Sequence, residues 1–228
     1  MSDARARFLA GVRLGAGPSA AVFVLALTFG AAARSAGWGS LLPLLFSMFA
    51  FSGSAQFALL TTLPTGSAVA SVASAVLINA RYVVMGVAIN DSLRGGRAWR
   101  AVQAQVLADA SFVIGHRGGG RFDILRLAGA SLPQWLCWVG GTAVGLAARP
   151  SPDLMHELGA DVVFPAFFLM LAMDEARHTR RAVAAAALGG AIAAAVLAVT
   201  EPGYALLAAT AGALVGAAST RSPEGADE

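Results

Sequence analysis

Long uncharged runs of apolar residues, separated by short arginine-rich segments, dominate the pattern along the chain. A helix needs about 20 apolar residues to cross the hydrocarbon core of a bilayer. Seven runs meet this need, the fifth only with its flanks: 14–33, 41–63, 65–80 (continuing past Arg81 to 90), 127–148, 162–173, 182–200 and 202–219. The pattern predicts an all-α polytopic membrane bundle of six or seven transmembrane helices. We expect one transmembrane domain over residues 1–228, with polar termini at about 1–10 and 220–228.

The run 41–63 is unusual because its middle reads Ser52-Gly53-Ser54-Ala55-Gln56. Small residues let helices pack closely, and a glutamine can hydrogen-bond to a neighbouring helix. Alternatively, the helix breaks or re-enters at this point, which is tolerated at membrane depth only where the backbone lines a cavity. Both interpretations stay open from the sequence.

Residues 99–115 form a shorter and ambiguous segment. On a single helix Val102, Val106 and Val113 share one face, which is typical of an interfacial amphipathic helix or of a segment that dips in and returns.

The composition agrees with a membrane protein. Of the 228 residues, 57% are hydrophobic and 13% are charged, whereas soluble domains carry about 25% charged residues. These values exclude a soluble domain, a disordered chain and a nucleic-acid-binding protein, and the single cysteine excludes a disulfide scaffold. The chain has no lysine, so it lacks the nucleotide-binding motif that ends in Gly-Lys. We expect no enzymatic activity, no cofactor and no metal site.

All basic residues are arginines, and most of them flank the apolar runs. Because cytoplasmic loops are enriched in Lys and Arg, Arg5, Arg7 and Arg13 predict a cytoplasmic N-terminus in the cell (plasma or inner) membrane. Three apolar runs separate this cluster from the next one, at Arg94 and Arg97. If all three runs cross the membrane, the two arginine clusters lie on opposite sides, which violates the positive-inside rule. The discrepancy disappears if 41–63 does not cross the membrane.

Arg81 is the only charged residue between Arg34 and Asp91. On a helix it continues a polar stripe formed by serines 67, 71 and 74, whereas Asn79 points about 120° away from this stripe. A charged group costs at least about 2.5–3.5 kcal/mol at the bilayer centre. We therefore expect Arg81 to be paired or functional, and the alternative is that it snorkels to the nearer membrane face.

Two aspartates are candidates for proton coupling. Asp109 falls at the centre of the valine face of residues 99–115, where a charge is misplaced unless it is paired, protonated or facing a cavity. The alternative is an interfacial helix on which Asp109 caps the end or contacts an arginine. Asp161 precedes the short run 162–173, so it fits a helix start or a surface position as well as a coupling role.

The segment Phe51-Ser52-Gly53-Ser54-Ala55-Gln56-Phe57, followed by Asn79-Ala80-Arg81-Tyr82, resembles the AzlC family, the large subunits of branched-chain amino-acid exporters. Weaker matches follow at 107–109, 138–142, 158–161 and 164–168. Tyr82 and Ala110 stand where the family usually has His and Glu, so a role of those two residues cannot be transferred.

The resemblance implies export of Leu, Ile, Val and sometimes Met, together with a small AzlD-like membrane subunit. It points to a substrate site that contains Ser52, Gly53, Ser54, Gln56, Phe57, Asn79 and Arg81. The alternatives are a passive channel or structural membrane subunit and, more remotely, an intramembrane hydrolase with Ser54 as nucleophile and His116 as base.

Overall fold

The computed structural model describes residues 2–64, 66–118, 120–148, 151–157 and 180–200, together with residues 162, 166, 169, 173, 204, 205 and 207–209. Within these residues the regular structure is helical, apart from a single antiparallel bridge between His116 and Phe122. The chain forms two compact units: unit 1 contains Met1–Gln56 and Ile78–Ala160, and unit 2 contains Phe57–Leu77 and Asp161–Glu228. Unit 1 carries most of the described structure.

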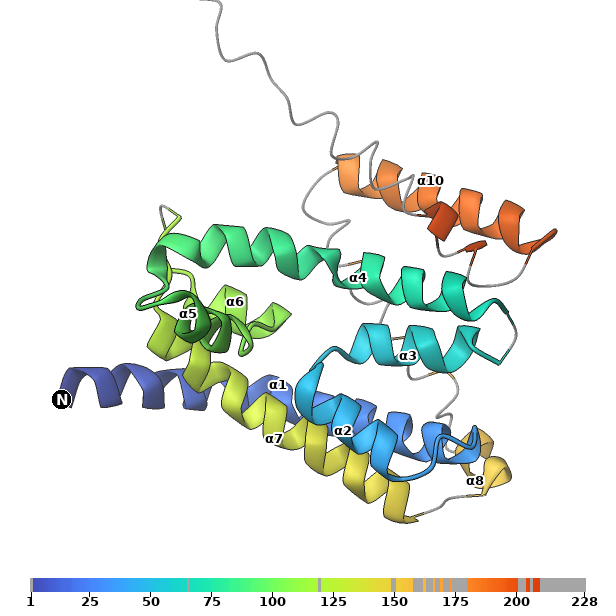
Figure 1. The fold of residues 1–228 in the computed structure, drawn as a ribbon, viewed down its shortest axis with the longest axis horizontal. Coiled ribbons are helices and arrows are strands. Elements are labelled where there is room, and N and C mark those ends of the chain that lie inside the picture. Colours follow the sequence, from blue (N-terminus) through green and yellow to red (C-terminus); the bar gives the residue numbers. More distant parts are fainter. Residues whose placement is uncertain are drawn as a thin grey trace, which may run out of the picture. The chain divides into compact units, whose positions relative to one another are not determined.

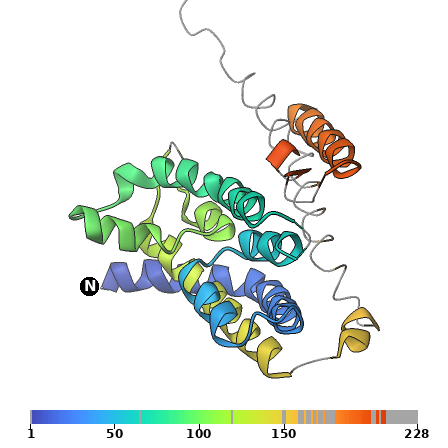
Figure 2. The same cartoon turned by 45° about the vertical axis from the view of Figure 1, so that its right-hand side comes forward.

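The helices α1 (Ser2–Ser35) and α7 (Ile124–Ala148) lie side by side and form the base of unit 1 (Figures 1 and 2). Glycines allow their backbones to touch: a Cβ atom on Gly145 would lie 2.2 Å from the carbonyl oxygen of Leu27. The same holds for Gly30 of α1, where a Cβ atom would lie 2.3 Å from the carbonyl oxygen of Thr142. Such close approach of small residues is a main source of helix association in membranes.

The run 41–63 forms two helices, α2 (Leu41–Phe49) and α3 (Gly53–Thr62), separated by residues 50–52. The prediction of a break in this run is therefore correct. α2 packs against α7 within unit 1.

The third run forms α4 (Ala68–Ile89), which ends in a short 3-10 helix, η1 (Asn90–Ser92). Many valines of α4 are exposed, among them Val69, Val83 and Val87. Among the described residues two helices, Asp3–Ser35 and Ala68–Ser92, are long and apolar enough to cross a membrane. The total of six or seven crossings stays a prediction.

Residues 99–115, which the sequence left ambiguous, do not form one continuous helix. They divide into α5 (Arg97–Ala104) and α6 (Asp109–Gly115). Ala108 is extended, with φ −141° and ψ 158°, and its N–H donates to the Ser111 hydroxyl at 3.0 Å. Because the helix is interrupted, the predicted face that joins Val102 to Val113 around Asp109 does not exist.

Two further helices are described, α8 (Pro152–Glu157) and α10 (Arg180–Leu197). α10 corresponds to the predicted run 182–200. Most of the runs 162–173 and 202–219 lies outside the described residues.

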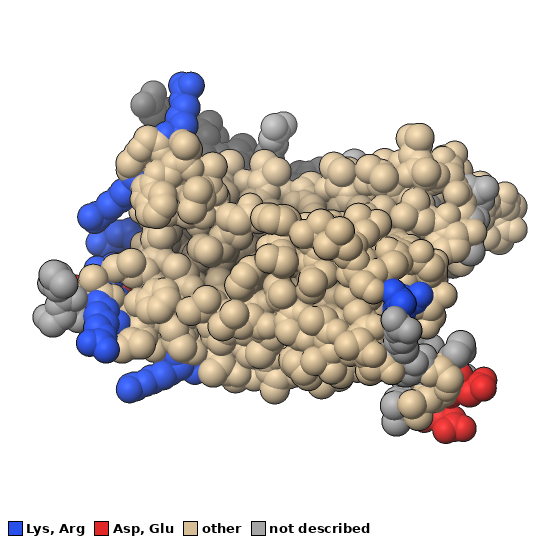
Figure 3. All heavy atoms as spheres, turned by 60° about the horizontal axis from the view of Figure 1, so that its bottom comes forward, with Lys and Arg blue, Asp and Glu red and all other residues tan. Residues whose placement is uncertain are grey.

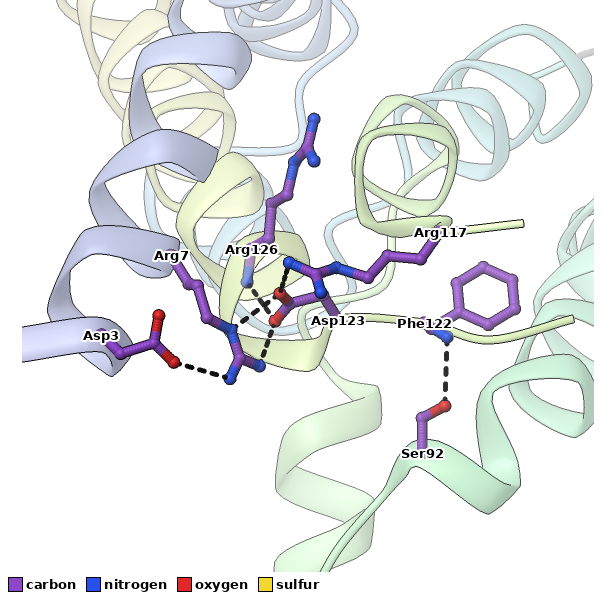
Figure 4. A network of polar contacts seen from close by, with 7 residues as sticks. All are labelled: Asp3, Arg7, Ser92, Arg117, Phe122, Asp123 and Arg126. Carbon is purple, nitrogen blue, oxygen red and sulfur yellow. Dashed lines mark hydrogen bonds and ion pairs between the residues drawn. The ribbon is translucent and has the colours of Figure 1, made fainter. Parts of the chain in front are cut away.

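Asp123 fixes the start of α7, and the sequence analysis did not single it out. Its carboxylate accepts two hydrogen bonds from the Arg7 guanidinium, at 2.8 and 2.7 Å, and one from the Arg126 backbone N–H at 3.2 Å. The Arg117 Nη2 atom lies 3.1 Å from Asp123 Oδ2 (Figure 4). The hydrogen bonds from Arg7, chiefly, lower the pKa of Asp123 even though the carboxyl is buried. This buried, fully bonded carboxylate ties the beginning of α1 to that of α7.

Candidate functional site

The site begins at the break between α2 and α3. Phe51 has a φ of +42°, and it is the one non-glycine residue with positive φ in the described part of the chain. A bulky residue in this region stores strain of about 1–3 kcal/mol and persists only where the surroundings enforce it. The Gln56 N–H donates to the Ser52 carbonyl at 3.1 Å, so regular helix resumes immediately after the break.

Side chains satisfy the carbonyl groups at the end of α2. The Trp135 indole donates to the Met48 carbonyl at 3.0 Å, and the Gln105 amide donates to the Phe49 carbonyl at 2.6 Å. Since these carbonyls already have protein donors, they are poorly placed to receive an ammonium group.

The start of α3 meets α4 through two hydroxyl groups. Ser52 Oγ donates to Asn79 Oδ1 at 2.6 Å, and Arg81 Nη2 donates to Ser54 Oγ at 3.0 Å. The Ser52 and Ser54 hydroxyls lie 3.4 Å apart. Although Asn79 and Arg81 were predicted to point in different directions from α4, both reach the same two-serine segment.

Arg81 also forms an ion pair with Asp109. Arg81 Nη2 lies 3.0 Å from Asp109 Oδ2 and 3.3 Å from the Tyr82 hydroxyl, and the guanidinium lies over the Tyr82 ring at 5.1 Å. The two side chains are 33% and 47% exposed, so the pair is not enclosed by the packing of unit 1. Arg81 Nε is buried and has no hydrogen-bond partner among the described residues. Arg81 is therefore paired, as one of the two sequence interpretations expected, and keeps an unused donor.

A small apolar core brings Asp109 to this position. Ile89 at the end of α4, Leu107 before α6 and Leu127 at the start of α7 form a buried cluster against which Tyr82 packs. Asp109 is the first residue of α6, directly after this cluster. Asp161, the second predicted coupling residue, lies outside the described residues.

Gln56 is fully buried and serves the packing of unit 1. Its amide nitrogen donates to Ser47 Oγ at 3.0 Å, and its carbonyl oxygen accepts from the Trp138 indole at 2.8 Å. Ser47 in turn lies 2.9 Å from the Thr142 hydroxyl. This network joins α2, α3 and α7 across the break. It corresponds to the packing interpretation of the Ser52–Gln56 segment.

Gly53 and Phe57 complete the set of predicted site residues. A Cβ atom on Gly53 would lie 2.6 Å from the Trp138 ring, so only glycine lets the indole cross the start of α3. Phe57, one turn further along α3, is buried.

Comparison with known proteins places this site in a family. The sequence model described as AzlC protein matches residues 19–150, which include every described site residue. The chain belongs to the AzlC family.

An uncharacterized membrane protein of Archaeoglobus fulgidus is 32% identical to this AzlC chain over 197 residues, covering 84% of this chain and 85% of that protein. No solved structure matches the chain. The chain is therefore a membrane protein of the AzlC family.

Three contributions to this AzlC site were missed from the sequence. Trp135 and Gln105 donate to the Met48 and Phe49 carbonyls at the end of α2. Trp138 donates to the Gln56 side chain. One general rule could have indicated them. The carbonyl groups at the end of an interrupted helix need hydrogen-bond donors, and Trp and Gln side chains on neighbouring segments can supply them.

Proposed function

We propose that this chain is the large subunit of a secondary exporter of the branched-chain amino acids Leu, Ile and Val, and in some cases of Met, working with a small AzlD-like membrane subunit. One observation carries the proposal. The apolar run 41–63 is interrupted and resumes as α3 at Gly53, beside Arg81. The Arg81 side chain is partly exposed, and its Nε has no hydrogen-bond partner among the described residues. Family membership supports it.

Arg81 and the first turn of α3 are suited to a carboxylate. A helix N-terminus has N–H groups without intrahelical acceptors and a positive dipole end, so it favours an anion. Arginine adds a charge-assisted fork that can bind a carboxylate through two oxygens. Ser54, which bonds to Arg81, belongs to this first turn.

Asp109 provides a means of proton coupling. It contacts Arg81 through one oxygen, and both side chains are partly exposed. A substrate carboxylate that binds Arg81 would compete with Asp109 for the guanidinium, and the substrate ammonium group would compete with a proton for the Asp109 carboxylate. Binding of substrate and of a proton would then be linked. Asp161 remains a second candidate for this role.

The charge distribution supports the proposed orientation. Figure 3 shows most arginines gathered at one end of unit 1, where α1 begins. We assign this end to the cytoplasmic side of the cell membrane, with the chain as one multi-pass transmembrane domain.

Counterflow of labelled leucine tests the function. Vesicles that contain the chain, with and without the proposed AzlD-like small subunit, are loaded with unlabelled leucine and diluted into tracer. We expect transient, saturable accumulation of tracer, accelerated by a proton gradient. The variant Asp109→Asn should retain counterflow but lose the acceleration, because the neutral amide cannot exchange a proton.

Asp91→Asn is the matched control, because Asp91 is exposed and lies in η1 away from Arg81. It should respond to the gradient as wild type does. Linear, non-saturable flux would instead show a channel. An unchanged gradient response in Asp109→Asn would contradict the coupling role while leaving the exporter assignment intact.

A further inference from the structure

An apolar cavity of about 400 Å³ lies within unit 1. Its lining comes from the first part of α1, the end of α2 with Phe51, the end of α5 with the residues that follow it, and one face of α7. The lining residues are Phe8, Met48, Phe51, Val102, Gln105, Val106, Ala128, Ser131, Leu132 and Trp135. A volume of this size falls within the range of about 300–1,000 Å³ that is usual for small-ligand sites.

The polar side chains around this cavity bond to the protein itself. Gln105 donates to the Phe49 carbonyl, Trp135 donates to the Met48 carbonyl, and Ser131 donates to the Val106 carbonyl. Their donors are directed at backbone atoms, and the remaining lining is hydrocarbon, aromatic ring or thioether. The cavity therefore suits an apolar chain better than a polar molecule.

Exposed arginines lie on two of the helices that line the cavity. Arg5 lies three residues before Phe8 on α1, so the two share a helix face. Arg97 lies in the first turn of α5, the helix that carries Val102. Trp99 of α5 is 60% exposed, as is typical of side chains at a membrane interface. Figure 3 shows arginines gathered at the end of unit 1 where α1 begins, and α1 is the helix that carries Arg5.

We propose that the cavity binds one acyl chain of an anionic glycerophospholipid, whose phosphate pairs with Arg5 and Arg97. The hydrocarbon lining accounts for the acyl chain, and charge complementarity accounts for the choice of an anionic headgroup. The bound chain would contact Met48 and Phe51, and so would support the break between α2 and α3. The lining shares the break between α2 and α3 with the candidate functional site but does not include Arg81, and the proposal does not depend on the transported substrate.

Lipid binding to the purified full-length chain in detergent tests the proposal, measured by native mass spectrometry with phosphatidylglycerol and phosphatidylcholine of equal chain length. We expect wild type to bind phosphatidylglycerol more tightly. The double variant Arg5→Gln/Arg97→Gln should bind it roughly 30-fold more weakly, since each arginine near a headgroup contributes about fivefold. Arg121→Gln, an exposed arginine of the 116–122 loop, is the matched control and should change binding little.

Filling the cavity tests the acyl-chain part. Val102→Phe enlarges a half-exposed lining residue, so folding should survive, and it should weaken binding of both lipids. Leu136→Phe, on an exposed position of α7 outside the lining, should not. Equal binding of the two lipids by wild type, or unchanged binding in Val102→Phe, would overturn the proposal. An equal loss in Arg121→Gln and in the double variant would overturn the headgroup assignment.

Discussion

Replacement of Arg81 by glutamine is expected to reduce leucine export about 100-fold while the protein still inserts and folds. The loss corresponds to about 1.5–3 kcal/mol for a hydrogen bond to a charged group. The fold should survive because the Arg81 and Asp109 side chains are 33% and 47% exposed, so the loss of this ion pair leaves no fully buried charge within unit 1. The measurement is initial export from vesicles at matched protein content, together with the melting temperature in detergent.

Two variants separate the charge of Arg81 from its shape. Arg81→Lys keeps the charge but loses the planar fork, so we expect intermediate export. Arg121→Gln removes an exposed arginine that is distant from Arg81 in the sequence. This variant should export leucine as wild type does. Wild-type export by a folded Arg81→Gln protein would contradict the proposed carboxylate site and favour the snorkelling interpretation.

The second large effect is expected from Gly145→Ala. The added Cβ atom would lie 2.2 Å from the Leu27 carbonyl oxygen, a backbone atom that cannot rotate away. The helices α1 and α7 must therefore separate, and we expect destabilisation at or above the roughly 1–3 kcal/mol of ordinary overpacking. The loss should appear as a lower melting temperature and as aggregation in size-exclusion chromatography.

Gly140→Ala on the same helix is the matched control. A Cβ atom on Gly140 meets no other atom within 4 Å, and alanine favours a helix over glycine by about 1 kcal/mol. This variant should be as stable as wild type or more so. Equal melting temperatures for the two alanine variants would contradict the close packing of α1 on α7.

The local features of the fold could be predicted from the sequence. The apolar runs predicted the helices α4 and α10. The small and polar residues at 52–56 indicated the break between α2 and α3 as one of two interpretations. The pairing of Arg81 followed from the cost of a lone charge in hydrocarbon. These signals are local, because they depend on residues that are neighbours along one helix.

Contacts between distant segments could not be predicted in this way. Gln56 and Trp138 are 82 positions apart, and no periodicity reports that they share a hydrogen bond. Asp109 was assigned to a helix face that the extended Ala108 interrupts. Asp123 lies in an arginine-rich loop, and the sequence does not indicate that it is buried. Its burial and its bonds to Arg7 depend on how α1 packs against α7.

Protection of a cysteine at position 54 tests the central claim, that substrate binds where α3 begins. Cys137 is the single cysteine of the chain, so Cys137→Ser combined with Ser54→Cys leaves one reactive thiol beside Arg81. We predict that leucine slows alkylation of this thiol by a small permeant reagent. A cysteine at the exposed Ala101 of α5 should react at the same rate with or without leucine. Unchanged alkylation at position 54, in a variant that still exports leucine, would contradict the account.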